Sequence, residues 1–100
     1  MQFEWDEAKA ARNLARHGID FDEASEVFFD PLHIEIEDVR FEYGERRMKA
    51  IGEFRGRLFV VVFTQRQDAV RIISARKAEP YERREYREGH SGKRTGPWKD

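Results

Sequence analysis

Three arginines near the ends of predicted β-strands are the side chains best suited to binding phosphate. Arg47 lies near the start of one predicted strand, Arg66 just past the end of the next, and Arg76 at the end of the last. A guanidinium can hold two phosphate oxygens with its planar fork, so arginines whose strand ends converge would form a phosphate-binding group. Taken singly, each is better explained as a solvated side chain at a strand end.

Proton transfer would fall to His17, at the end of a predicted helix. An unperturbed histidine has a pKa of about 6.5 and can act as an acid or a base near physiological pH. Lys9 precedes it by eight residues, about two helical turns and roughly 80° around the helix, so both side chains could reach one site. The alternatives are that His17 caps backbone carbonyls beside Gly18 and that Lys9 is an ordinary solvated residue.

Three further residues are candidates for contacting a substrate. Lys49 shares a predicted strand face with Arg47, and both are expected to face solvent if the opposite face is buried. Arg71 could pair with an acidic residue instead. Tyr86 could donate a proton or stack on a base, but its aromatic body suits a core position at least as well.

Several other chemistries lack the residues they need. The absence of cysteine excludes disulfides, thiolate catalysis and cysteine-based zinc sites. Ser74 lacks a G-x-S-x-G setting, which argues against a hydrolase triad. No H-E-x-x-H motif is present, and Glu35, Glu37 and Asp38 are best explained as a solvated edge, so we expect neither metal nor cofactor. Arg12 and His17 fit the R-x4-H pattern of all-helical HEPN ribonucleases, but three convincing strands argue against that fold.

Charge is distributed unevenly along a chain whose net charge is only -1. Residues 1–45 carry 13 acidic and 4 basic side chains, whereas residues 46–87 carry 12 basic and 5 acidic ones. Such asymmetry is typical of nucleic-acid contact or a charged partner. It is equally consistent with two halves that attract each other within one fold.

Length and hydropathy predict one soluble, cytoplasmic domain. One hundred residues is the size of a single domain. The longest apolar run, Leu58 to Phe63, has six residues and cannot span a bilayer. Glu4, Asp6 and Glu7 near the N-terminus make a signal peptide improbable.

Hydrophobic periodicity predicts an α+β fold. Two N-terminal helices precede an antiparallel sheet of about four strands and a C-terminal helix. The helices are expected over Asp6–His17, from the cap Asp22 to Pro31, and over Pro80–Arg87; the strands over His33–Glu37, Arg46–Phe54, Leu58–Thr64 and Val70–Ala75. Phe3 and Trp5 could belong to an edge strand. Residues 1–88 form the domain, and 89–100 are expected to be a flexible tail.

Short segments spread over residues 2–88 resemble one known family. They are Phe3-Glu4-Trp5-Asp6 with Lys9 and Asn13, His17-Gly18 with Phe21 and Ala24, Val27-Phe28 with Asp30-Pro31, Gly44-Glu45 with Arg47, Ile51-Gly52, Val60-Val61-Val62 with Thr64 and Arg66, Arg71 to Arg76, and Glu82 with Tyr86. In this order and spacing they are similar to the BrnT family of type II toxins. Arg46 departs from the pattern, because the family more often has an acid there.

The resemblance implies a RelE-like fold, RNA cleavage without a metal ion, and a DNA-binding antitoxin that neutralises the toxin and represses the operon. It also favours Arg47, Arg66 and Arg76 as a phosphate-binding group. Operator DNA would be contacted only through the antitoxin complex. The alternative is a non-catalytic module whose basic half docks an acidic antitoxin.

Overall fold

The protein is an α+β domain built on one five-stranded sheet, as a computed structural model shows; the structure describes residues 1–38 and 44–90. The elements are β1 (Gln2–Glu4), α1 (Glu7–His17), α2 (Phe21–Ser25), the 3-10 turn η1 (Glu26–Phe29), β2 (Ile34–Glu37), β3 (Met48–Phe54), β4 (Arg57–Arg66), β5 (Ala69–Lys77) and α3 (Pro80–His90). The predicted α+β class is therefore correct. Within the described ranges, no helix is long and apolar enough to cross a membrane.

The sheet has the order β1-β5-β4-β3-β2, which corrects the expected antiparallel sheet of about four strands. The strands from β2 to β5 pair in antiparallel fashion, but β1 adds a fifth strand that runs parallel to β5. The alternation around Phe3 therefore marks a real edge strand. A parallel pair needs a crossover connection, and α1 begins that crossover.

Capping residues determine where the first two helices begin. Asp6 Oδ1 accepts hydrogen bonds from the backbone N–H groups of Ala8 and Lys9, at 2.8 and 3.1 Å, and α1 ends at Gly18 in the left-handed conformation. The cap of α2 is Asp20 rather than the expected Asp22. Asp20 and Glu23 form a reciprocal capping box, and this sequence signal lies two residues before the predicted cap.

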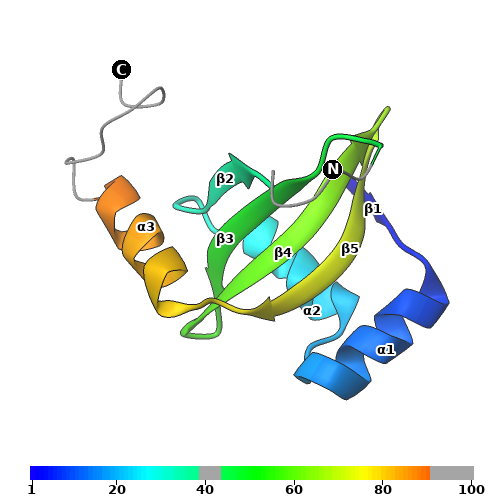
Figure 1. Ribbon diagram of the computed structural model, residues 1–100, viewed down its shortest axis with the longest axis horizontal. Coiled ribbons are helices and arrows are strands. Elements are labelled where there is room, and N and C mark those ends of the chain that lie inside the picture. The colour runs from blue at the N-terminus through cyan, green and yellow to red at the C-terminus, as the bar shows by residue number, and fades with distance from the viewer. Residues whose placement is uncertain (39–43, 91–100) are drawn as a thin grey trace.

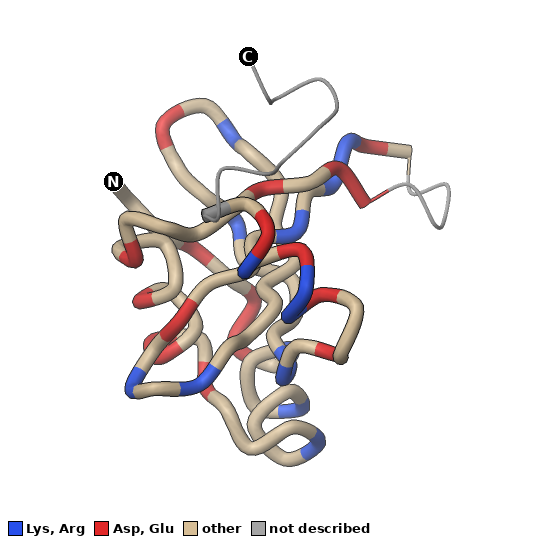
Figure 2. Tube along the Cα trace, turned by 90° about the vertical axis from the view of Figure 1, so that its left-hand side faces the viewer, with Lys and Arg blue, Asp and Glu red and all other residues tan. Residues whose placement is uncertain are grey.

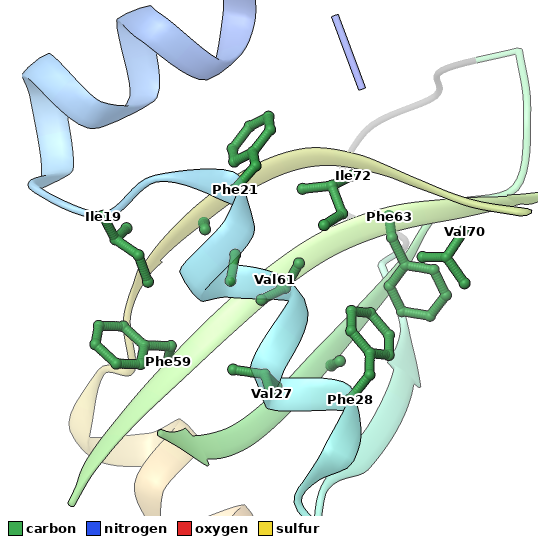
Figure 3. Close-up of a cluster of buried hydrophobic side chains, with 12 residues drawn as sticks. Ile19, Phe21, Val27, Phe28, Phe59, Val61, Phe63, Val70 and Ile72 are labelled. Carbon is green, nitrogen blue, oxygen red and sulfur yellow. The ribbon is translucent and has the colours of Figure 1, made fainter. Parts of the chain in front are cut away.

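The main core lies between the sheet and the N-terminal helices. In Figure 1, α2 passes behind the sheet, and Figure 3 shows Phe21 near Ile72 and Phe28 beside Phe63, in one cluster with Val27 and Val61. This side of the sheet is called the first face, and the opposite side the second face. Gly52 allows the close approach of η1, because a Cβ there would lie 2.7 Å from Val27 Cγ1.

The hairpin turns are tighter than expected, so the last strands are longer. Arg55 and Gly56 form a two-residue turn with φ values of 54° and 79°, which matches the twist of the flanking strands. Gln67 has a φ of 49° in the next turn. At the C-terminus, α3 ends at His90, three residues past its predicted end at Arg87, so Gly89 and His90 of the predicted tail are helical. The remainder of the predicted tail, 91–100, and residues 39–43 of the predicted loop lie outside the described residues.

Candidate functional site

The second face of the sheet carries most of the basic candidate residues. Side chains directly opposite one another in a sheet share a face, and the register pairs Lys49 with Val62 and Val62 with Ser74. The same alternation places Arg47 and Arg66 on this face. The opposite face of β3 is the buried one, because Ala50 belongs to the main core and Met48 and Phe54 pack against it.

A bulge in β5 brings Arg71 and Arg76 to this same face. In a regular strand, residues five apart point to opposite sides of the sheet. Here Val62 pairs with Ser74 but Phe63 pairs with Ile72, so one extra residue, Ile73, shifts the alternation. The sequence alone gave no sign of this bulge, which moves Arg76 to the second face.

The three arginines predicted to converge share a face but do not meet at one place. Arg76 lies opposite Val60 on β4, and Arg66 lies six positions farther along that strand. At about 3.3 Å per residue, the two backbone positions are about 20 Å apart. Arg47 belongs with Arg66, because both contact Glu45, at 3.6 and 3.8 Å. The three arginines therefore lie on one surface but do not meet at one point of it, and the phosphate-binding role of the group stays a prediction.

Several basic residues pair with the acidic half of the chain. Arg71 Nη1 lies 3.2 Å from Glu4 Oε2, and Arg46 Nε lies 3.7 Å from Glu37 Oε2. The Glu45 contacts of Arg47 and Arg66 also join the two halves. Figure 2 accordingly shows acidic and basic residues interspersed over the fold. For these arginines, the charge asymmetry is satisfied at least in part within the domain.

Arg76 and Lys49 instead meet on one buried carboxylate, Glu82 of α3. Glu82 has no exposed surface. Its Oε1 accepts from Arg76 Nη1 at 2.8 Å, and its Oε2 accepts from Arg76 Nη2 and Lys49 Nζ, each at 2.9 Å. Tyr81 completes the group, since its hydroxyl donates to Glu82 Oε2 at 3.2 Å and its ring lies 5.1 Å from Lys49 Nζ. These four residues are called the Glu82 cluster.

The Glu82 cluster is charged and tightly held. Burial raises the pKa of Glu82, but hydrogen bonds from Arg76, the Glu79 N–H and Lys49 outweigh it and lower that pKa to about 2. The pKa of Arg76 is raised, chiefly by its hydrogen bonds to Glu82. One negative and two positive charges leave a surplus of one positive charge. Lys49 is 7% exposed and so does not face solvent as expected.

A second basic feature is a groove of about 510 Å³ between α1 and β5. It forms because α1 lies beside β5 (Figure 1) and is held there by the side chain of Asn13. The Asn13 amide donates to the Ala75 carbonyl at 2.9 Å and accepts from the Ala75 N–H at 3.1 Å, as a neighbouring strand would.

The structure brings Lys9 and His17 together in this groove. Its basic lining is Lys9, Arg12, Arg16 and His17, and Ser74 of β5 lies on its opposite wall. This set is called the α1 groove. At the end of α1, the Gly18 N–H donates to the Leu14 carbonyl. Among the described contacts, the His17 ring makes no hydrogen bond to a backbone carbonyl, which argues against the alternative that it caps the helix.

Tyr86 has a structural position. It is 8% exposed, and its hydroxyl donates to Asp30 Oδ2 at 2.7 Å. Asp30 also accepts from the N–H groups of Leu32 and Glu53, so it ties three segments together. Burial and the Asp30 carboxylate raise the pKa of Tyr86. Its ring belongs to the small core cluster beneath α3, the core role that the sequence left open.

The residues that sequence reasoning did not select are Glu82 and Tyr81. Glu82 follows Glu79 by three residues at the start of α3 and accepts a hydrogen bond from the Glu79 N–H at 2.9 Å. That spacing is half of a capping box and was available as a signal. Its pairing with Arg76 and Lys49 depends on tertiary structure. The described residues contain no group of three or more His, Asp or Glu side chains that could hold a metal ion.

Fold and site together define a small α+β domain whose sheet carries several arginine and lysine side chains on one face, most of them paired with carboxylates. The family model for the ribonuclease toxin BrnT of type II toxin-antitoxin systems matches residues 5–82. The chain therefore belongs to the BrnT family, as its sequence resemblance indicated. Members of such a family act on RNA and have an antitoxin partner. No curated protein matches the chain.

Proposed function

We propose that this toxin is a metal-independent endoribonuclease and that the Glu82 cluster binds the scissile phosphate. The substrate's own 2′-hydroxyl attacks the phosphorus and the 5′-oxygen leaves, which gives a 2′,3′-cyclic phosphate and a 5′-hydroxyl end. The observation that carries the proposal is the pair Arg76 and Lys49, two cations fixed on one buried carboxylate. Preorganised cations lower the barrier because negative charge on the phosphate oxygens grows in the transition state.

The cluster keeps donors for a phosphate even though both cations are engaged. An arginine has five N–H donors. Arg76 uses three of them, two for Glu82 and one for the Lys77 carbonyl at 3.2 Å. Its side chain is 22% exposed, so a substrate can approach it. Two N–H groups of Arg76 therefore remain for phosphate oxygens, with Lys49 beside them.

His17 is the residue proposed to move a proton. It lines the α1 groove with Ser74, and Ser74 is two residues from Arg76 on the same face of β5. A histidine near neutral pH can accept the 2′-hydroxyl proton or protonate the leaving oxygen. Lys9 lines the same groove and would contact the substrate.

The remaining basic residues are proposed to bind the substrate away from the reacting phosphate. Arg47 and Arg66 lie farther along the second face, and Arg71 lies across the sheet from Thr64. Tyr81 is 41% exposed beside the cluster and offers its ring to a base. We propose no contact between substrate and Tyr86, which is buried on Asp30.

The partner is proposed to be a DNA-binding antitoxin that covers this surface. An antitoxin that occupies the second face would exclude RNA and would bring the complex to operator DNA through its own DNA-binding part. The toxin would act in the cytoplasm, where both RNA and operator are found.

The proposal is tested by incubating purified protein with single-stranded RNA in excess EDTA. Cleavage is expected, whereas DNA of the same sequence should stay intact because it has no 2′-hydroxyl. Arg76→Gln should lower the single-turnover rate by about 10²–10³-fold, the scale of one lost transition-state donor. His17→Gln should lower it by about 10²–10⁴-fold.

Arg84→Gln is the matched control, because Arg84 is an exposed α3 arginine outside the cluster. It should cleave like the parent protein. Intact RNA with nuclease-free wild-type protein, together with normal growth on expression without the antitoxin, would refute the proposal. That outcome would favour a non-catalytic partner module.

A further inference from the structure

The basic residues of the acidic half are concentrated on one helix. Residues 1–45 carry only four Lys and Arg side chains, and three of them, Lys9, Arg12 and Arg16, lie on α1. Spacings of three and four residues place them on one helical face. All three line the α1 groove. Basic positions recur along α1, the lowest helix in Figure 2.

These three cations differ from the arginines of the sheet in forming no ion pair among the described residues. Arg47, Arg66 and Arg71 each form an ion pair with Glu45 or Glu4. In residues 1–38 and 44–90, no carboxylate lies within ion-pair distance of Lys9, Arg12 or Arg16. Asp6 caps the same helix through its Oδ1 and attracts Lys9 and Arg12 without forming an ion pair with either. The groove therefore presents three positive charges with no ion pair, of which Lys9 and Arg12 are offset in part by Asp6.

Ser74 relates the groove to the Glu82 cluster by its position on β5. Ser74 lines the groove, lies two residues from Arg76 and is opposite Val62, which in turn is opposite Lys49. We propose that the α1 groove is an extended RNA-binding site, where Lys9, Arg12 and Arg16 bind phosphates that flank the one held by the Glu82 cluster. The position of these phosphates next to the scissile one rests on the proposed function, whereas binding of a nucleic-acid strand to the groove does not.

The chemistry of the groove favours a nucleic-acid strand over a protein. Lys9 and Arg16 are seven residues apart, about 10 Å along the helix, and an RNA strand offers one negative charge per nucleotide over that length. Protein interfaces are typically built around aromatic and apolar anchors. The groove has no aromatic lining except the His17 imidazole, and its apolar members are Ala15 and Ile73.

The test measures binding of a fluorescent single-stranded DNA, which the full-length toxin is not expected to cut. Arg12→Gln/Arg16→Gln is compared with Arg84→Gln/Arg87→Gln, which removes the same charge from exposed positions on α3. The α1 variant should raise Kd on the order of 10-fold at physiological salt, because each lost phosphate contact removes about 0.7 from the salt slope. The α3 variant should leave Kd and slope unchanged.

Arg12→Lys/Arg16→Lys keeps both charges and should bind like the parent, which separates loss of charge from loss of folding. An unchanged Kd and salt slope in the glutamine variant would overturn the inference, as would an equal loss in the α3 control. Loss of antitoxin binding with unchanged DNA binding would assign the groove to the protein partner instead. If wild-type protein binds as expected but cuts no RNA, the proposed function fails and the groove site stands.

Discussion

The Glu82 cluster and the α1 groove use positive charge in opposite ways. In the cluster, Arg76 and Lys49 are oriented by a fully buried carboxylate, which leaves one surplus positive charge. In the groove, Arg12 and Arg16 form no ion pair and no hydrogen bond that orients them among the described residues. An oriented cation suits a transition state, whereas an unpaired one suits long-range attraction of a polyanion.

The contrast predicts that the two sites affect different quantities, the rate of RNA cleavage and the affinity for nucleic acid. Loss of an oriented cation should lower the rate of the chemical step with little effect on binding, because the interaction strengthens only as charge develops. Loss of an unpaired cation should weaken binding in a salt-dependent manner and leave the rate of the bound complex unchanged. The comparison also implies different costs in stability, which the variants below measure.

The largest expected effect is that of Glu82→Gln on stability. Removing one partner of a buried ion pair leaves the others uncompensated, so the free energy of unfolding should fall by about 3–5 kcal/mol. Urea unfolding gives this value. Glu79→Gln, an exposed change at the residue just before α3, should stay within about 0.5 kcal/mol of the parent. A loss below 1 kcal/mol for Glu82→Gln would show that the cluster is not held by its carboxylate.

Acid should remove the same stabilisation. The pKa of Glu82 is lowered from 4.5 to about 2 in the folded protein. The unfolded chain therefore binds more protons between these values, and the stability from Glu82 is present above pH 4.5 and lost as pH falls toward 2. The difference in unfolding free energy between the parent and Glu82→Gln should shrink across this window. A difference that stays constant from pH 6 to pH 2.5 would contradict the assignment.

The two tyrosines of α3 are expected to differ in function, because Tyr81 belongs to the Glu82 cluster and Tyr86 does not. Tyr86→Phe removes a hydrogen bond to the Asp30 carboxylate, so it should cost about 1.5–3 kcal/mol of stability and leave the cleavage rate of folded protein unchanged. Tyr81→Ala removes an exposed ring and should weaken RNA binding by about 1–3 kcal/mol if the ring stacks a base. Unfolding and binding titrations of both variants give these values. If Tyr86→Phe weakened RNA binding and Tyr81→Ala did not, Tyr86 would be the tyrosine that contacts the substrate.

The sequence was sufficient to predict local secondary structure, but not to predict which basic side chains lie close together. Hydrophobic periodicity located α1 and the core faces of the strands, and the Phe3 alternation marked an edge strand. It could not show the bulge at Ile73, which depends on pairing with β4 and decides the face on which Arg76 lies. The sequence also shows only that Arg76 and Arg66 both lie at strand ends. The strand register places them near opposite ends of the sheet, and the register cannot be read from the sequence.

The smallest expected effect is that of Arg12→Gln/Arg16→Gln on stability, and it is the counterpart of Glu82→Gln. Neither arginine has an ion pair to lose among the described contacts, and glutamine is a good helix former. Arg16 lies in the last turn of α1, where a cation favours the helix dipole by about 0.3–1 kcal/mol. The double variant should therefore unfold within about 1 kcal/mol of the parent in urea while its DNA affinity falls. A loss near 3 kcal/mol would mean that the groove arginines are structural, and the division between oriented and unpaired cations would not hold.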